Sequence, residues 1–452
     1  IDSPLSAITG ILLWMAIWWI SECVPLAVTS LIPLAIFPFV GITSTKEIAP
    51  LYMNHIIFLF AGGFLLAFAI EKWNLHKRIA LNIINLIGSN IKKIILGFML
   101  ATAFLSMWIS NTATSVMMLP IGIAIISQLK DNPATKKNEN LIFGKALMLA
   151  IAYSASIGGI ATLIGTPPNL VLAGVVQESY GVEITFSQWF MFGFPISVVF
   201  LFLCWFYLTR VAFKFKQKAF PGGSEEINKQ LNALGKMSFE EKMILSVFIL
   251  TAFAWMSRSF LLKQFVTAID DTIIAIISAF ILFLLPTKDK KSRLLNWGDT
   301  VKLPWGILLL FGGGMALALG FESSGLAVWI GEQMTSLKTF PLILLLLVLI
   351  ASVNFLTEIT SNLATTAMLL PVLVSLASAI GVHPYFLLVG ATVAASCAFM
   401  LPVATPPNAV VFGSGYLKIE DMFKKGLWMN IVSIILLTLI VYFVLPLLWD
   451  LS

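Results

Sequence analysis

The chain has 452 residues, of which 59% are hydrophobic and only 11% are charged, and its formal net charge at pH 7 is +6. Soluble domains carry about a quarter charged residues, so this composition excludes an ordinary water-soluble protein. Continuous apolar runs long enough to cross a bilayer recur along the whole length, which predicts an all-α polytopic membrane protein. The basic residues lie in short runs between these spans, as in cytoplasmic loops, and do not indicate a nucleic-acid partner.

The first half of the chain contains both uninterrupted and interrupted apolar segments. Uninterrupted spans are predicted at 5–21, 24–40, 55–70 and 189–209, with an amphipathic segment at 71–93. Segment 94–129 is interrupted by Ser110-Asn111-Thr112, and both of its flanks are basic. Because Lys and Arg favour the cytoplasmic side, both ends lie on that side, which predicts a re-entrant hairpin. Segment 146–177 is predicted to be a broken helix, because Pro167-Pro168 removes two backbone donors.

After a basic connector at 210–242, predicted to be cytoplasmic, the second half repeats this order. Spans are predicted at 243–257, 271–286, 304–321 and 426–449, with a hairpin at 339–380 and a broken helix at 385–416. The second hairpin tip reads Ser361-Asn362-Leu363, and the second break, Thr405-Pro406-Pro407-Asn408, repeats Thr166-Pro167-Pro168-Asn169.

The basic loops of the second half lie at the opposite ends of its elements, so its hairpin is predicted to enter from outside. The sequence therefore predicts an inverted-topology repeat, with 1–209 as the first copy and 243–452 as the second. When the predicted membrane crossings are counted back from the cytoplasmic loops, Ile1 lies on the outer side. This predicts either an external N-terminus or one further helix ahead of Ile1.

The sequence shows no set of catalytic residues. Three cysteines lie in apolar segments without a metal-binding spacing, and neither HExxH nor GxSxG occurs. We therefore expect neither an enzyme nor an organic cofactor.

The interruptions themselves indicate a binding site. Unwound backbone at membrane depth is tolerated only where it is buried in protein or lines a cavity. Helix starts there favour an anion, and the exposed carbonyls of helix ends favour a small cation. The alternative is that these Ser, Thr and Asn residues only hold helices together.

In its paired tips and paired Pro-Pro-Asn breaks, the sequence resembles the divalent anion/sodium symporter family of sodium-coupled di- and tricarboxylate transporters, over nearly the whole chain. This resemblance implies a secondary active symporter of sodium and a succinate-like C4 dicarboxylate, which works by an elevator-type mechanism. It also implies a homodimer in the plasma (inner) membrane. A sodium-independent exchanger of dicarboxylates or related anions on the same fold is the alternative.

The resemblance also implies the roles of individual residues. The substrate would contact Asn111, Thr112, Asn362, Thr166, Pro167, Thr405 and Pro406. One sodium ion would be bound by Ser106, Ser110, Asn111 and the backbone near Gly159. The other would be bound by Thr357, Thr360, Asn362 and the backbone near Ala404.

Two residues near the second tip leave questions open. Leu363 occupies the position where the full Ser-Asn-Thr pattern of the first tip has Thr. The two tips therefore cannot bind a carboxylate in the same way, and the preferred di- or tricarboxylate is open. Glu358 precedes the tip by three residues, where the first half has Met107. It either neutralises a cation or carries a proton, or it caps or pairs near the end of the hairpin.

Overall fold

The computed structural model describes residues 4–88, 90–128, 139–215, 223–333 and 335–451, and nearly all of them lie in helices or the turns between helices. Within these ranges, eight helices are long and apolar enough to cross a membrane. Shorter apolar helices accompany them. The predicted all-α polytopic architecture is confirmed.

The first half contains the first hairpin and the first broken helix. Its helices are α1 (Pro4–Ser21), α2 (Leu26–Thr29), α3 (Ile32–Ile36), α4 (Thr45–Ile48), α5 (His55–Lys72), α6 (Leu75–Ile87), α7 (Ile91–Ser106), α8 (Asn111–Gln128), α9 (Glu139–Ile160), α10 (Pro167–Tyr180) and α11 (Phe186–Phe206). Helices α7 and α8 form the hairpin, and α9 and α10 are the two parts of the broken helix. Both interruptions fall at the predicted motifs.

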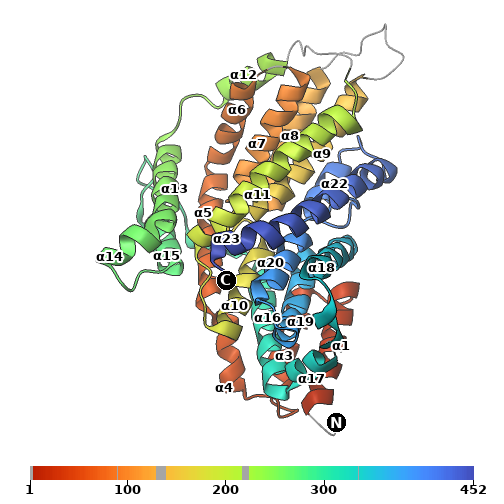
Figure 1. Cartoon of the computed structure of the whole chain (residues 1–452). Coiled ribbons are helices and arrows are strands. Elements are labelled where there is room, and N and C mark those ends of the chain that lie inside the picture. The colour runs from red at the N-terminus through yellow and green to blue at the C-terminus, as the bar shows by residue number, and fades with distance from the viewer. Residues whose placement is uncertain (1–3, 89, 129–138, 216–222, 334, 452) are drawn as a thin grey trace.

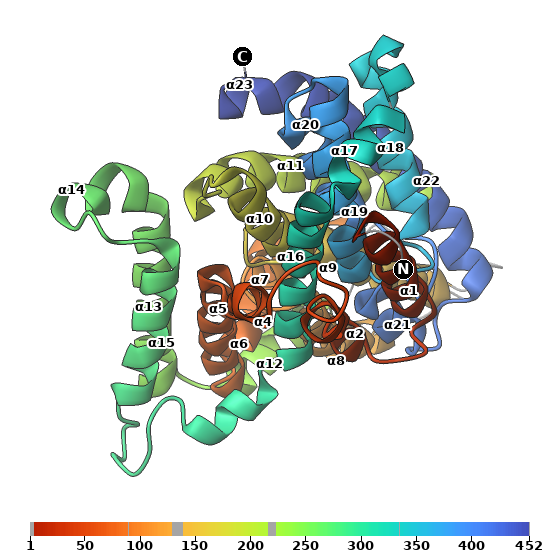
Figure 2. The same cartoon turned by 90° about the horizontal axis from the view of Figure 1, so that it is seen from below.

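The second half follows the short helix α12 (Gly223–Ala233) of the connector. Its helices are α13 (Phe239–Ser257), α14 (Lys263–Phe265), α15 (Asp271–Leu284), α16 (Trp305–Ser324), α17 (Leu326–Gln333), α18 (Leu342–Leu356), α19 (Asn362–Ile380), α20 (Pro384–Ala395), α21 (Pro406–Phe412), α22 (Ile419–Leu439) and α23 (Leu445–Trp449). Helices α13, α14 and α15 form an arm along one side of the molecule (Figures 1 and 2). We call these three helices the side arm.

Two predicted segments differ from the observed elements. The single span predicted at 24–40 is not continuous, because the chain turns between α2 and α3. Together these two helices cover Leu26–Ile36, which is shorter than the roughly 20 residues of a membrane-spanning helix. The amphipathic segment predicted at 71–93 is the helix α6 with its two flanks. Position 129 of the first hairpin, positions 216–222 of the connector and Ile1 lie outside the described residues.

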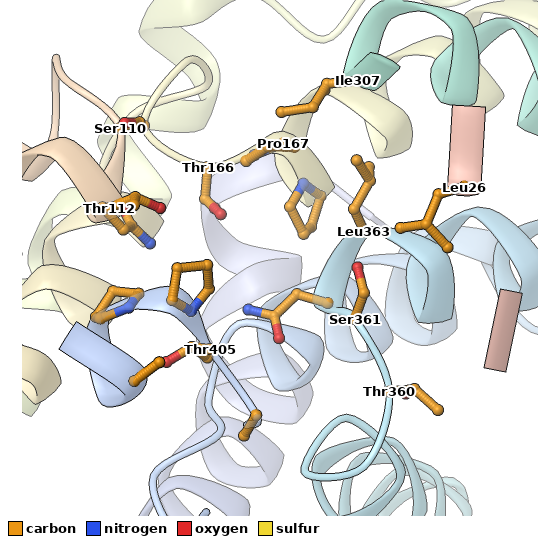
Figure 3. Close-up of a pocket in the computed structure, with 18 of the residues that line it drawn as sticks. Leu26, Ser110, Thr112, Thr166, Pro167, Ile307, Thr360, Ser361, Leu363 and Thr405 are labelled. Carbon is orange, nitrogen blue, oxygen red and sulfur yellow. The ribbon is translucent and has the colours of Figure 1, made fainter. Parts of the chain in front are cut away.

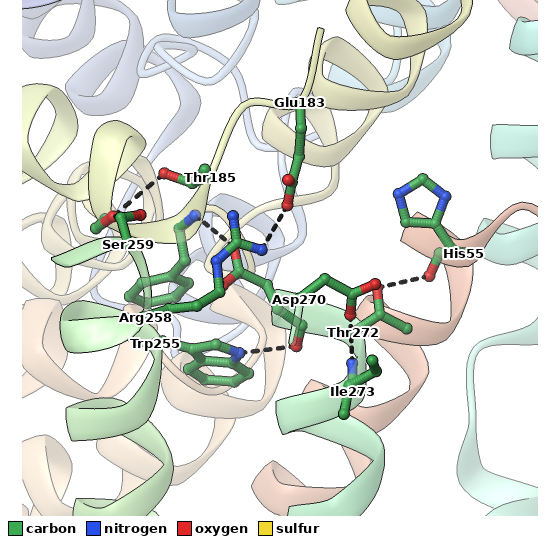
Figure 4. A network of polar contacts seen from close by, with 12 residues as sticks. His55, Glu183, Thr185, Trp255, Arg258, Ser259, Asp270, Thr272 and Ile273 are labelled. Carbon is green, nitrogen blue, oxygen red and sulfur yellow. Dashed lines mark hydrogen bonds and ion pairs between the residues drawn. The ribbon is translucent and has the colours of Figure 1, made fainter. Parts of the chain in front are cut away.

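A buried ion network joins the side arm to the connection between α10 and α11 (Figure 4). The side chain of Arg258 is fully buried; its Nη1 lies 2.6 Å from the Glu183 carboxylate, and its Nε lies 3.3 Å from that of Asp271. Asp271 also accepts a hydrogen bond of 2.7 Å from the backbone N–H of Phe186, at the start of α11. Removing one partner from such a buried pair costs about 3–5 kcal/mol, so the network holds the side arm in place.

Close helix packing fixes the first broken helix against the first hairpin. A Cβ atom built on Gly158 of α9 would overlap with the backbone of Ala103 of α7, 2.6 Å from its Cα. A second close contact of this kind joins α16 to the turn after α2, where a Cβ atom on Gly313 would lie 2.7 Å from the carbonyl oxygen of Ser30. Small residues permit backbones to approach this closely in membrane helices.

We predict that Gly158→Ala lowers the melting temperature of the detergent-purified protein. The added methyl group has no space at this contact, and overpacking costs about 1–3 kcal/mol. Gly10→Ala is the matched control, because a Cβ atom there meets nothing within 4 Å and Ala favours a helix over Gly. Equal melting temperatures for Gly158→Ala and wild type would mean that α7 and α9 do not pack this closely.

Candidate functional site

The interruptions in the two halves meet at one cavity of about 730 Å³. Its wall includes both hairpin tips, which precede α8 and α19, and both breaks, which precede α10 and α21. The end of α1, together with α2, α5 and α16, supplies the remaining wall. Figure 3 shows side chains from both hairpin tips and both breaks around the same space.

The cavity brings together the residues predicted to bind substrate and sodium. The predicted residues that line it are Ser110, Asn111, Thr112, Thr166, Pro167, Thr360, Asn362, Ala404, Thr405 and Pro406. Ser106, Gly159 and Thr357 are not part of the lining and lie directly behind the two Asn side chains. The roles assigned to these residues stay predictions.

Each hairpin tip has a hydroxyl group behind its Asn side chain. In the first half, Oγ of Ser106 lies 2.6 Å from Oδ1 of Asn111 and 2.7 Å from the carbonyl oxygen of Ala155. In the second half, Oγ1 of Thr357 lies 2.8 Å from Oδ1 of Asn362 and 3.0 Å from a carbonyl oxygen of α20. The same arrangement of oxygens therefore occurs twice.

Three oxygens surround one atom of the Asn111 side-chain amide. The Ser106 hydroxyl lies 2.6 Å from this amide atom, and the carbonyl oxygens of Ala155 and Gly165 each lie 3.3 Å from it. With Oδ1 at that place, the amide oxygen faces other oxygens, and a bound cation would satisfy all of them. With Nδ2 there, the amide donates to all three oxygens, and this orientation satisfies the side chain when no cation is bound. The site therefore suits either an amide donor or a small hard cation.

At each break, an Asn side chain donates hydrogen bonds to backbone carbonyl oxygens. Nδ2 of Asn169 donates to the carbonyl oxygens of Gly159 and Thr162, at 3.2 and 2.8 Å. Nδ2 of Asn408 donates to the carbonyl oxygens of Ala398 and Leu401, at 3.2 and 3.0 Å. Each Asn thus satisfies two carbonyl groups that the broken helix leaves without a helical partner.

A serine of each hairpin tip caps the helix that follows it. Oγ of Ser110 accepts from the backbone N–H of Ala113 at 3.2 Å, and Oγ of Ser361 accepts from that of Ala364 at 3.4 Å. These caps begin α8 and α19 at the cavity, so the positive ends of both helices lie there.

Among the described residues that line the cavity there is no Lys or Arg, and Glu22 is the one charged residue. The part of the chain that the structure describes also has no cluster of three or more His, Cys, Asp or Glu residues that could hold a metal ion. Apart from Glu22, a cation in this cavity would meet only neutral oxygens, and an anion would meet amides, hydroxyls and helix N-termini.

Glu358 holds the second break in shape. Its side chain is buried, and its carboxylate accepts from the backbone N–H groups of Phe399, Met400 and Leu401 at 2.7, 3.0 and 3.0 Å. Nδ2 of Asn430, on α22, adds a fourth hydrogen bond of 2.7 Å. Of the two interpretations of Glu358, these contacts fit the capping role. Asn430 was missed by sequence reasoning, because no motif marks it.

The comparisons with known proteins agree with this architecture. Residues 2–449 match the transmembrane region of the sodium:sulfate symporters. The chain belongs to this family of divalent anion/sodium symporters. Like the other members, it is a transporter and not an enzyme, and it is an integral, multi-pass protein of the plasma membrane.

Two relatives of this symporter carry the name sodium-dependent dicarboxylate transporter SdcS. One is from Staphylococcus saprophyticus and the other from Staphylococcus aureus strain USA300. Each is 48% identical over 445 residues, and the match covers 97% of this chain and 86% of the relative.

Two solved transporters share the fold of this symporter at low sequence identity. Neisseria gonorrhoeae MtrF superposes with a TM-score of 0.61 at 14% identity, over 98% of this chain and 96% of its own. Alcanivorax borkumensis YdaH has the same TM-score at 12% identity, over the full length of both chains. These likenesses concern the fold alone.

We predict that Glu358→Gln lowers the melting temperature of the purified symporter more than Glu22→Gln does. The new amide brings an NH₂ group toward four donors, and hydrogen bonds to a charged group each contribute about 1.5–3 kcal/mol. The control makes the same chemical change at an exposed residue of the cavity wall. A Glu358→Gln protein that is as stable as wild type but transports nothing would instead favour the cation or proton role.

Proposed function

We propose that the protein carries a small dicarboxylate of the succinate type into the cell together with sodium. The observation that carries this proposal is the duplicated oxygen cluster, in which Ser106 stands behind Asn111 and Thr357 stands behind Asn362. The 48% identity, over nearly the whole chain, to relatives named sodium-dependent dicarboxylate transporters supports the same substrates.

Sodium binding at these clusters follows from their chemistry. Hydroxyl, amide and carbonyl oxygens that converge from a hairpin tip and a helix break are ligands that sodium takes in membrane transporters. In the first site these are Ser106, Asn111 and the carbonyls of Ala155 and Gly165. Of the predicted sodium ligands, Thr360 donates its hydroxyl hydrogen to the carbonyl oxygen of Leu356 at 2.9 Å, and its Oγ1 lies 2.6 Å from Oγ1 of Thr365. A lone pair of the Thr360 oxygen would still be available to a sodium ion.

The substrate site is the cavity between the two tips. Asn111, Thr112 and Asn362 would bind the carboxylates, and the Thr-Pro pairs at the starts of α10 and α21 would close the site. Because the described lining holds no Lys or Arg, the bound sodium ions would supply the positive charge next to the dianion.

The transport movement belongs to the same proposal. Residues 1–209 and 243–452 would be inverted repeats joined by the connector 210–242, each with a re-entrant hairpin and a broken helix. In support, α8 packs against α12 at one end of the molecule, and α19 packs against α17 at the other (Figure 1). The hairpins and broken helices would slide as an elevator within each subunit of a homodimer. Light scattering of the detergent-purified protein would measure its mass and so test the dimer.

We predict that proteoliposomes take up radiolabelled succinate along an inward sodium gradient and lose this uptake when choline replaces sodium. Asn111→Ala and Asn362→Ala are each expected to lose it as well, because each removes an oxygen of one cluster. Uptake that persists in choline and requires dicarboxylate inside the vesicle would support the exchanger. No uptake of succinate in either medium would refute the proposed substrate.

We further predict that Ser106→Ala and Thr357→Val each raise the sodium concentration for half-maximal uptake. The loss of one oxygen ligand worth about 1.4 kcal/mol corresponds to roughly a tenfold increase. Ser246→Ala is the control, because it removes a hydroxyl from the exposed surface of α13. Unchanged sodium dependence in both cluster variants would place the sodium sites elsewhere.

A further inference from the structure

The two hairpin tips differ at one position that faces the cavity. Thr112 follows Asn111 at the start of α8, and Leu363 follows Asn362 at the start of α19. Both side chains line the cavity, but Thr112 is exposed while Leu363 is only 8% exposed. A hydroxyl group in one half is therefore replaced by a packed alkyl group in the other.

Leu363 belongs to an apolar wall on one side of the cavity. Figure 3 shows it together with Leu26, from α2, and Ile307, from α16, which line the same cavity. We call these three residues the apolar wall. Ile359 and Val403 continue the apolar lining in the second half and are 66% and 81% exposed. No side chain of these five can make a hydrogen bond.

The opposite side of the cavity is polar. Ser110, Thr112 and Thr166 present hydroxyl groups there, away from the apolar wall (Figure 3). Thr405 uses its hydroxyl to cap the N–H of Asn408, whereas Thr166 makes no such capping bond. The second half also offers the hydroxyls of Ser361 and Thr405, each of which caps a backbone N–H, but it has no counterpart of the Thr112 hydroxyl.

We propose that the site binds its dicarboxylate asymmetrically and that Leu363 determines which carbon skeleton is preferred. One carboxylate lies at Thr112 and Thr166, the other lies at Asn362, and the carbon chain between them packs on the apolar wall. This proposal rests on the proposed function. It assigns the site to C4 dicarboxylates with an alkyl substituent, in preference to those with a hydroxyl substituent at the same carbon.

The expected size of this preference follows from the chemistry of the wall. A methyl group that becomes buried against alkyl side chains strengthens binding roughly fourfold. A hydroxyl group in the same place loses its water without gaining a partner, and this weakens binding by about threefold or more. The ratio between the two ligands is therefore expected to be about tenfold.

The test is competition against uptake of radiolabelled succinate, with 2-methylsuccinate and malate (2-hydroxysuccinate) as inhibitors. Both have the charge and chain length of succinate and differ only in the substituent. The wild-type protein should be inhibited about ten times better by 2-methylsuccinate, and Leu363→Thr should remove or reverse this ratio. Leu344→Thr makes the same change on an exposed face of α18 and should keep the wild-type ratio.

The ratio is measured within one preparation, and a smaller folded fraction of a variant lowers the rate of uptake without changing either inhibition constant. Ile307→Thr, on a different helix of the apolar wall, should shift the ratio in the same direction. Succinate uptake with no preference for 2-methylsuccinate, or a preference that Leu363→Thr leaves intact, would overturn this inference and leave the proposed function standing. Absence of sodium-dependent succinate uptake in the wild-type protein would overturn both.

Discussion

Every polar backbone group inside an apolar core has to find a partner, and this constraint shapes the centre of the molecule. Two helices are broken there, and each break frees carbonyl and N–H groups far from water. The side chains of Asn169 and Asn408 satisfy the freed carbonyls, and the carboxylate of Glu358 satisfies three freed N–H groups. Further oxygens of the breaks lie behind the hairpin tips, where Ser106 and Thr357 donate to them, and under the proposed function these are the groups that bind sodium.

The two halves meet this constraint by different means. In the second half the loop at the break is held by the Glu358 carboxylate. In the first half Met107 occupies the equivalent place, and its carbonyl oxygen accepts from Thr162 Oγ1 at 2.5 Å. A neutral contact therefore does on one side what a buried carboxylate does on the other. The halves share their geometry, but they differ in charge and, at Thr112 and Leu363, in polarity.

The sequence predicted the parts of the fold that depend on local pattern. Both tips and both breaks could be placed, because Ser-Asn and Pro-Pro motifs act on their immediate neighbours. The discontinuity within 24–40 was missed, because the whole segment is apolar and hydropathy does not register the turn between α2 and α3. Asn430 and the Arg258 network were also missed. Their partners are far away in sequence, and a single sequence carries no signal for such pairs.

The composition of the cavity also bears on why substrate and ion should move together. A dicarboxylate carries two negative charges, and the attraction or repulsion between charges is strong where water is scarce. The described lining offers amides, hydroxyls and helix N-termini but no Lys or Arg, and its one charged residue, Glu22, repels an anion. A fixed cation would hold the dianion whether or not sodium were present. In a site without a fixed cation, the positive charge has to arrive with the ions. Under the proposed function, coupling therefore follows from the absence of Lys and Arg in the described lining.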